Sequence, residues 1–137
     1  MPESDKIVFV AQEWITKAEN DLKNAAHTIK LGSDCPTDTV CFHAQQCVEK
    51  YLKGFLVILE TAFPRTHDIE VLISLLPKGV RIPLTVFQQR QLTEYALLTR
   101  YPGSYEPISL SEARDAVKLA RKVKRKMQKL LEKKGLF

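Results

Sequence analysis

Apolar residues recur every three or four positions in five stretches of the chain, which is the spacing of an amphipathic α-helix. The first stretch covers residues 5–31, with Ser4 available as its N-cap. Its apolar positions are Val8, Ala11, Trp14, Ile15, Ala18, Leu22, Ala25, Ala26 and Ile29. The segment LGSDCPTD then predicts a break, since Gly32 suits a helix C-terminus and Thr37 or Asp38 can cap the next helix.

The remaining four stretches are separated by proline and glycine. A second long helix should run to about Ala62, and Asp68 can cap a short third helix. A fourth helix is expected from near Pro83 to Thr99, and a capping box at Ser109 opens a fifth that continues to about Lys134. No strand-like alternation, hairpin signal or internal repeat is present in the sequence. The pattern predicts an all-α fold, an antiparallel up-down bundle of about five helices, three long and two shorter.

Amino-acid composition indicates which class of protein this is. The chain has 137 residues, of which 45% are apolar and 27% charged, as expected for one globular domain over residues 1–137. The first residues do not resemble a signal peptide and no apolar run is long enough to span a membrane, so we expect a cytoplasmic protein. Cys35, Cys41 and Cys47 fit neither a disulfide framework nor a zinc site, and Cys41 and Cys47 should pack as small apolar residues.

Charge is concentrated in the last predicted helix. Residues 111–134 hold ten basic residues and three acidic ones, a net +7, so the rest of the chain carries −2 of the total +5. The basic residues are Arg114, Lys118, Arg121, Lys122, Lys124, Arg125, Lys126, Lys129, Lys133 and Lys134. This helix could contact nucleic-acid phosphates, or it could be the solvated face of the bundle.

The second helix carries an unusual set of polar residues within CFHAQQCVEKYLK (residues 41–53). At 100° per residue, one polar stripe forms at the positions His43, Gln46, Lys50 and Lys53. These donors could bind phosphate and base edges, or they could simply be solvated. Three apolar residues of the same helix lie off its core sector and predict a homodimer interface: Phe42, Leu56 and Val57.

Several catalytic motifs are missing from the sequence. It has no Walker-type phosphate loop, no G-x-G-x-x-G, no H-E-x-x-H and no serine nucleophile elbow. We therefore predict neither a cofactor nor a metal, and any hydrolytic chemistry would have to come from the histidines and Arg100.

Four short motifs in order give a family resemblance. They are W-x3-A-x2-D-L (residues 14–22), FHAQQ-x-x-EK-x-LK (42–53), TH-D (66–68) and TRYP (99–102), followed by the basic helix. Together they resemble the HEPN domain family over roughly residues 10–130. The resemblance implies a helical bundle that commonly dimerises and is often paired with a minimal nucleotidyltransferase, as toxin and antitoxin. Several branches are metal-independent ribonucleases with an Arg followed four to six residues later by His.

This chain departs from that ribonuclease pattern. Arg100 matches the Arg by its place, but no His follows His67. The residues four to seven positions after Arg100 are Ser104, Tyr105, Glu106 and Pro107. Because attack by a ribose 2′-hydroxyl needs a proton acceptor that titrates near neutrality, we expect a protein without catalysis of that kind.

Two functional interpretations remain open. The first is a nucleotide- or RNA-binding HEPN-like module that acts with a minimal nucleotidyltransferase, Arg100 and Tyr101 serving as a phosphate clamp and stacking surface. The second is a metal-independent endoribonuclease toxin that uses Arg100 with His43 or His67.

A third interpretation is structural. The chain would then be an interaction bundle with a basic C-terminal helix. In that case Arg100 bridges to a carboxylate such as Glu94 or Glu49, and His67 has a structural role beside Asp68.

Overall fold

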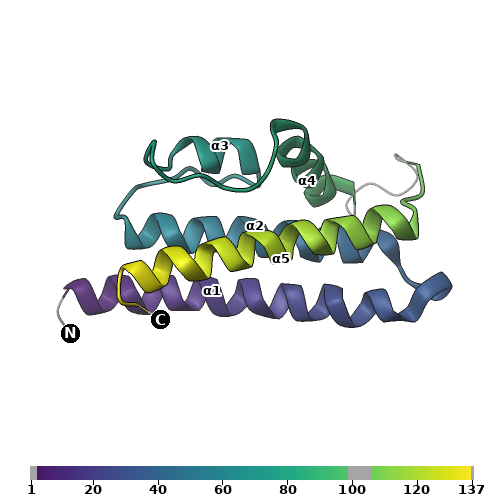
Figure 1. Cartoon of the computed structure of the whole chain (residues 1–137), viewed down its shortest axis with the longest axis horizontal. Coiled ribbons are helices and arrows are strands. Elements are labelled where there is room, and N and C mark those ends of the chain that lie inside the picture. The colour runs from purple at the N-terminus through teal and green to yellow at the C-terminus, as the bar shows by residue number, and fades with distance from the viewer. Residues whose placement is uncertain (1–2, 99–105, 137) are drawn as a thin grey trace.

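A computed structural model describes residues 3–98 and 106–136 of the chain. Three long helices lie side by side: α1 (Glu3–Thr28), α2 (Thr37–Ile58) and α5 (Leu110–Lys133) (Figure 1). A 3-10 turn, η1 (Ile29–Asp34), joins the first two, and the shorter α3 (Ile69–Ser74) and α4 (Val86–Leu98) lie over α2. The predicted all-α class and the number of helices are confirmed.

The helix ends follow local chemistry at most predicted positions. Asp68 accepts a hydrogen bond from the Val71 N–H at the start of α3, and Ser109 accepts one from the Glu112 N–H at the start of α5. The predicted cap of α2 was wrong, because Pro36 takes the N-cap position and the Thr37 hydroxyl donates to the carbonyl of Ile108 instead.

The remaining ends differ slightly from the prediction. Ser4 lies inside α1, which already includes Glu3. Gly32 adopts φ +62° and ψ −127°, a conformation that favours glycine, and it turns the chain towards α2. At the other end of α2, Glu60 has φ +55° and the Thr61 N–H donates to the Leu56 carbonyl, so the helix ends at Ile58, before the predicted Ala62.

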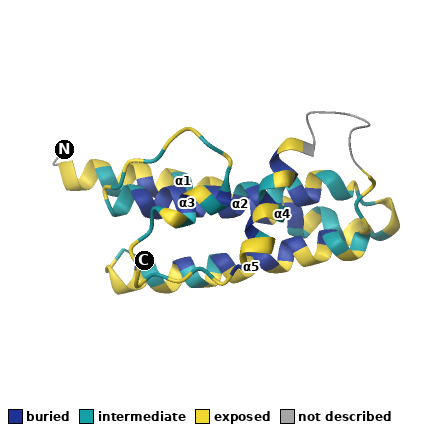
Figure 2. Ribbon diagram, turned by 90° about the horizontal axis from the view of Figure 1, so that it is seen from above, coloured by how far each residue is buried: buried dark blue, intermediate teal, exposed yellow. Residues whose placement is uncertain are grey.

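Helix α2 is the centre of the molecule. It packs against α1, α5, α4 and α3, and the start of α5 is tied to the start of α2 by the Thr37–Ile108 hydrogen bond. Helices α2 and α5 therefore run in the same direction, and α1 runs opposite to both, because α3 and α4 return the chain to the end where α2 begins (Figure 1). A helix with neighbours on so many sides has few solvated positions (Figure 2).

Close approach of α1 and α2 depends on small residues. Ala11, Ala18 and Ala25 of α1 are buried against α2. At Gly54 of α2, a methyl group would lie 3.2 Å from the Ile15 Cγ1. The largest fully buried side chains include Tyr51, Phe55, Leu52, Leu56, Ile69, Leu72, Leu92, Met127 and Leu131. The two cysteines of α2, Cys41 and Cys47, are buried among them as predicted.

Candidate functional site

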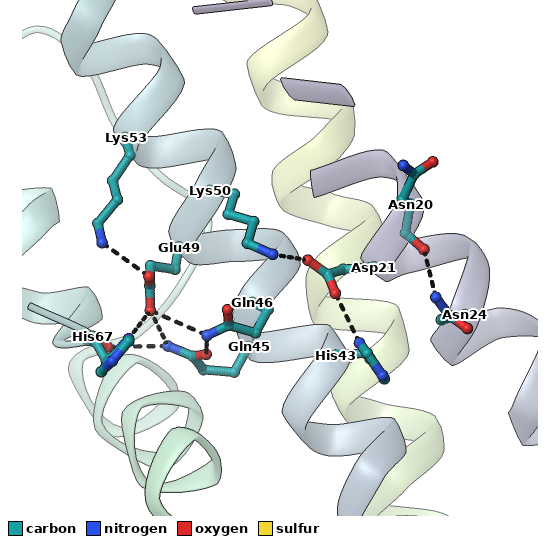
Figure 3. Close-up of polar contacts among 10 residues, drawn as sticks. All are labelled: Asn20, Asp21, Asn24, His43, Gln45, Gln46, Glu49, Lys50, Lys53 and His67. Carbon is teal, nitrogen blue, oxygen red and sulfur yellow. Dashed lines mark hydrogen bonds and ion pairs between the residues drawn. The ribbon is translucent and has the colours of Figure 1, made fainter. Parts of the chain in front are cut away.

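The central helix carries polar side chains into positions that solvent hardly reaches. Gln45, Glu49 and Lys53 are all buried, with exposed fractions of 0%, 3% and 7%. Burial of a polar or charged group is costly unless a partner compensates for it, so each of these side chains should have a partner. Together with His43 and Lys50 of the same helix, these side chains and their partners form two separate clusters on either side of α2 (Figure 3).

The first cluster is built on Asp21 of α1, which is 8% exposed. One carboxylate oxygen, Oδ1, lies 2.7 Å from Nδ1 of His43, and the other, Oδ2, accepts a hydrogen bond of 2.6 Å from Nζ of Lys50. Both partners come from α2, about two turns apart along it. Asp21 therefore joins α1 to α2 (Figure 3).

The second cluster is built on Glu49 of α2 itself. Its Oε2 accepts a hydrogen bond of 2.9 Å from Nζ of Lys53. Its Oε1 lies 2.9 Å from Nδ1 of His67 and accepts from Nε2 of Gln45 at 3.0 Å and of Gln46 at 3.3 Å. Because Gln45 also donates to the backbone carbonyl of His67, the loop that precedes α3 is fixed to α2.

Electrostatics favour the ionised form of Glu49. Burial alone would raise the pKa of this carboxyl, but hydrogen bonds from Gln45, Lys53 and His67 outweigh it and hold the pKa below its ordinary value. The ammonium of Lys53 is further held by two aromatic faces, 5.5 Å from the ring centre of Trp14 and 5.9 Å from that of Phe63.

The predicted single polar stripe is therefore two sets of internal contacts. His43 and Lys50 pair with Asp21, whereas Gln46, Lys53 and His67 gather on Glu49. Sequence reasoning did not include Asp21 and Glu49 among the site residues. Asp21 carried a signal, since it lies on the apolar face of the first helix, next to Leu22, where an acid needs a partner.

The two histidines keep part of the ring exposed to solvent. The His43 side chain is 33% exposed and that of His67 44%. With Nδ1 directed at a carboxylate, the opposite nitrogen Nε2 of His43 points away from Asp21 (Figure 3). A carboxylate that fixes the imidazole in this way is also how enzymes orient a catalytic histidine. Arg100 and Tyr101 lie outside the described residues.

The three residues predicted at a dimer interface differ in their exposure to solvent. Phe42 and Val57 are partly exposed, and the Phe42 ring lies edge-on to His43, with ring centres 5.6 Å apart. Leu56 is fully buried within its own chain. This corrects the expectation that Leu56 faces outward, because helices of the same chain cover the side of α2 that the sequence left open for a partner.

A cleft of about 510 Å³ lies between α4 and the segment that leads into α5. Its described lining includes three carboxylates, of Glu94, Glu106 and Glu112, and one guanidinium, of Arg90. The Tyr95 hydroxyl donates a 2.6 Å hydrogen bond to Glu112, and burial together with that bond raises the pKa of this phenol. The described part of this cleft thus has the wrong charge for a phosphate.

Half of the exposed basic side chains in the described part of the chain lie along α5 and at its C-terminal end. The exposed cations there are Arg114, Lys118, Arg121, Lys122, Arg125, Lys129, Lys133 and Lys134. Within residues 3–98 and 106–136, no group of three or more His, Cys, Asp or Glu side chains could hold a metal ion. None of the described helices is long and apolar enough to cross a membrane.

Comparison with known proteins agrees with the geometry. The model of the HEPN domain matches residues 11–130. Among solved structures, TT1696 from Thermus thermophilus is 29% identical, with a TM-score of 0.73 over 87% of this chain and 96% of that chain. ST0689, an archaeal HEPN homologue, is 23% identical, with a TM-score of 0.64 over 88% of this chain and 97% of that chain. No curated protein matches. Because the family match spans most of the helical bundle just described, the chain belongs to the HEPN domain family.

Proposed function

We propose that this HEPN domain is a non-catalytic binding module that recognises nucleotide or RNA phosphates as a cytoplasmic homodimer. We further propose that it acts with a minimal nucleotidyltransferase in a toxin–antitoxin type system. One observation carries the non-catalytic part: no His follows Arg100 in the sequence, so the Arg-x4-6-His pattern is incomplete. In addition, the histidines and lysines of the predicted α2 site are paired with Asp21 and Glu49 of the same chain. The carboxylates offset the charge that Lys50 and Lys53 could offer a phosphate, so the role of the paired side chains is to hold α1, α2 and the loop before α3 together.

A second function has its own supporting observation. The Asp21–His43 pair orients an imidazole that is one-third exposed, which suits a general base for attack by a ribose 2′-hydroxyl. In this alternative, Arg100 would stabilise the charge that develops on the phosphate. The chain would then be a metal-independent endoribonuclease toxin with an arrangement other than Arg-x4-6-His.

Incubation of the protein with RNA in the presence of a chelator separates the two functions. We expect no cleavage above that of a matched sample of His43→Ala protein. Cleavage that is lost in Arg100→Ala and in either His43→Ala or His67→Ala, but kept in His27→Ala, would establish the ribonuclease instead. His27 is a suitable control because it is an exposed histidine of α1.

Assembly is tested by light scattering at tens of micromolar protein. We expect the mass of a dimer, and a shift towards monomer in Phe42→Glu, because a charge at a partly exposed aromatic would have to be desolvated on association. Exposed Phe87 on α4 gives a control, since Phe87→Glu should leave the mass unchanged. A monomer mass for the unmodified protein would contradict the proposed dimer.

The nucleotidyltransferase partner requires a direct test. If a minimal nucleotidyltransferase is encoded beside this chain, co-expression of the two should give a complex that survives gel filtration. Separate elution of the two proteins at micromolar concentration would leave a module that binds phosphates alone, or a purely structural bundle if no nucleotide or RNA binds either.

A further inference from the structure

Helix α5 has two faces of opposite character. One face is buried against α2 and α1, with Ala113, Ala116, Val117, Ala120, Val123, Met127 and Leu131 in the core. The opposite face is exposed, and the alternation of buried and exposed positions can be followed along the helix in Figure 2. The buried face anchors the helix, so the charges on the other face are held on a rigid support.

Six cations share this exposed face, and we call them the basic stripe: Arg114, Lys118, Arg121, Lys122, Arg125 and Lys129. At about 100° per residue they fall within a sector of about 100°. At a rise of about 1.5 Å per residue they extend along about 22 Å of the helix. The steps between neighbours are mostly three or four residues, which places charges about 5–6 Å apart.

No cation of the basic stripe forms an ion pair with an acid of the described chain. Of the ion pairs among residues 3–98 and 106–136, only that of Lys124 with Glu19 at 3.5 Å involves α5, and Lys124 is not in the stripe. Asp115 is the one acid between Arg114 and Lys129, and it lies at the edge of the sector. The lysines paired in the two clusters of α2, in contrast, each have a carboxylate within 2.9 Å.

We propose that the basic stripe is a track for the phosphate backbone of a nucleic acid, bound without regard to base sequence. This inference rests on the proposed function and assigns its RNA contacts to α5 rather than to α2. A regularly repeated line of positive charge is matched along its whole length by a polymer with regularly repeated anions, and duplex DNA carries one charge per about 1.7 Å of axis. Three of the six cations are arginines, which bind phosphate oxygens in pairs.

The lack of base recognition also follows from the side chains present. Neither aromatic nor asparagine residues occur between Arg114 and Lys129, so the stripe offers no ring on which a base could stack, and Gln128 is its single amide. Contacts to phosphates alone position a nucleic acid but do not read its sequence. Affinity should therefore depend on salt and length and hardly on base composition.

The dependence of RNA affinity on salt gives the expected size of the effect. Neutralising Z phosphates makes log K fall with log salt at a slope of about −0.9Z for a duplex and about −0.7Z for a single strand. If all six cations are engaged, the slope should reach roughly −5 for a duplex and roughly −4 for a single strand. Removing three should halve the slope and, at about 0.1 M salt, weaken binding roughly a hundredfold.

The experiment is fluorescence anisotropy with labelled RNA of about 20 nucleotides, single-stranded and duplex, over about 50–200 mM salt. The stripe variant carries Lys118→Gln, Arg121→Gln and Arg125→Gln. A control variant with the same change of charge carries Lys6→Gln, Lys17→Gln and Lys23→Gln, all exposed on α1. Circular dichroism melting of both variants verifies that they fold, and since every position is exposed, we expect no loss of structure.

For the stripe variant, we expect the slope of log K against log salt to be about half that of the unmodified protein. The control variant should bind like the unmodified protein. If the unmodified protein binds RNA but both variants bind equally well, the stripe inference is overturned while RNA binding by the module stands. The inference is again overturned if a polyglutamate peptide of the same charge binds as tightly as RNA does and that binding is lost in the stripe variant. In that case the surface fits an acidic protein. Absence of RNA binding at the lowest salt also refutes it, and titration with free nucleotide then decides whether the proposed function survives.

Discussion

Replacement of Glu49 by glutamine should strongly destabilise this protein. The change keeps the shape of the side chain but removes the charge that neutralises Lys53, whose side chain is only 9% exposed. It also turns an acceptor of four hydrogen bonds into a group with its own N–H donors. Breaking a buried ion pair in this way costs roughly 3–5 kcal/mol.

The aromatic neighbours of Lys53 decide where in the range of roughly 3–5 kcal/mol the loss of stability falls. Trp14 and Phe63 remain beside the Lys53 ammonium after the substitution, and a desolvated cation–π contact contributes about 2 kcal/mol. We therefore expect a loss near about 3 kcal/mol in the free energy of unfolding, a large part of the roughly 5–15 kcal/mol of a typical domain. Urea unfolding followed by circular dichroism measures it.

Two further variants make the test specific. In Glu49→Gln with Lys53→Met, the stranded ammonium is gone, so the double variant should be more stable than Glu49→Gln by at least about 1 kcal/mol. Glu70→Gln is the matched control, because its partner Arg90 is 69% exposed and the pair is screened by water, so its stability should hardly change. A loss below about 1 kcal/mol for Glu49→Gln, equal to that of the control, would refute the buried cluster.

Three other expectations follow from the same structure. The folded state lowers the pKa of Glu49, so the stability that its carboxylate contributes is present above the unfolded pKa of about 4.3 and is lost as pH falls through the pKa of the folded state. In urea unfolding, the difference in stability between the protein and Glu49→Gln should therefore shrink from about pH 7 to about pH 3. Burial raises the pKa of Cys41 and of Cys47 to about 12, so iodoacetamide at about pH 8 should label only Cys35 in the native protein, and mass spectrometry showing a second label would contradict this. Glu60→Gly should raise the free energy of unfolding in urea by about 0.5–1 kcal/mol, because Glu60 has φ +55°, whereas Glu60→Ala should give no gain.

Local patterns in the sequence were enough to predict the helices of this protein and most of their ends. Helical periodicity and capping depend on residues within a few positions of one another, so Ser109 and Asp68 could be assigned as caps from the sequence alone. The concentration of positive charge in the last helix was equally visible, since it is a matter of counting. The family resemblance likewise rested on short motifs in order along the chain.

Which polar residues face water could be known only from the packing of the helices. On a helical wheel, a stripe of His43, Gln46, Lys50 and Lys53 is the same whether solvent or a carboxylate of another helix lies opposite. Packing of α1 against α2 brings Asp21 to two of them, and the loop before α3 brings its histidine to the Glu49 carboxylate. The same packing buries Leu56 and leaves the basic stripe of α5 exposed, because the number of neighbours around a helix is a property of the whole fold and not of the helix's own sequence.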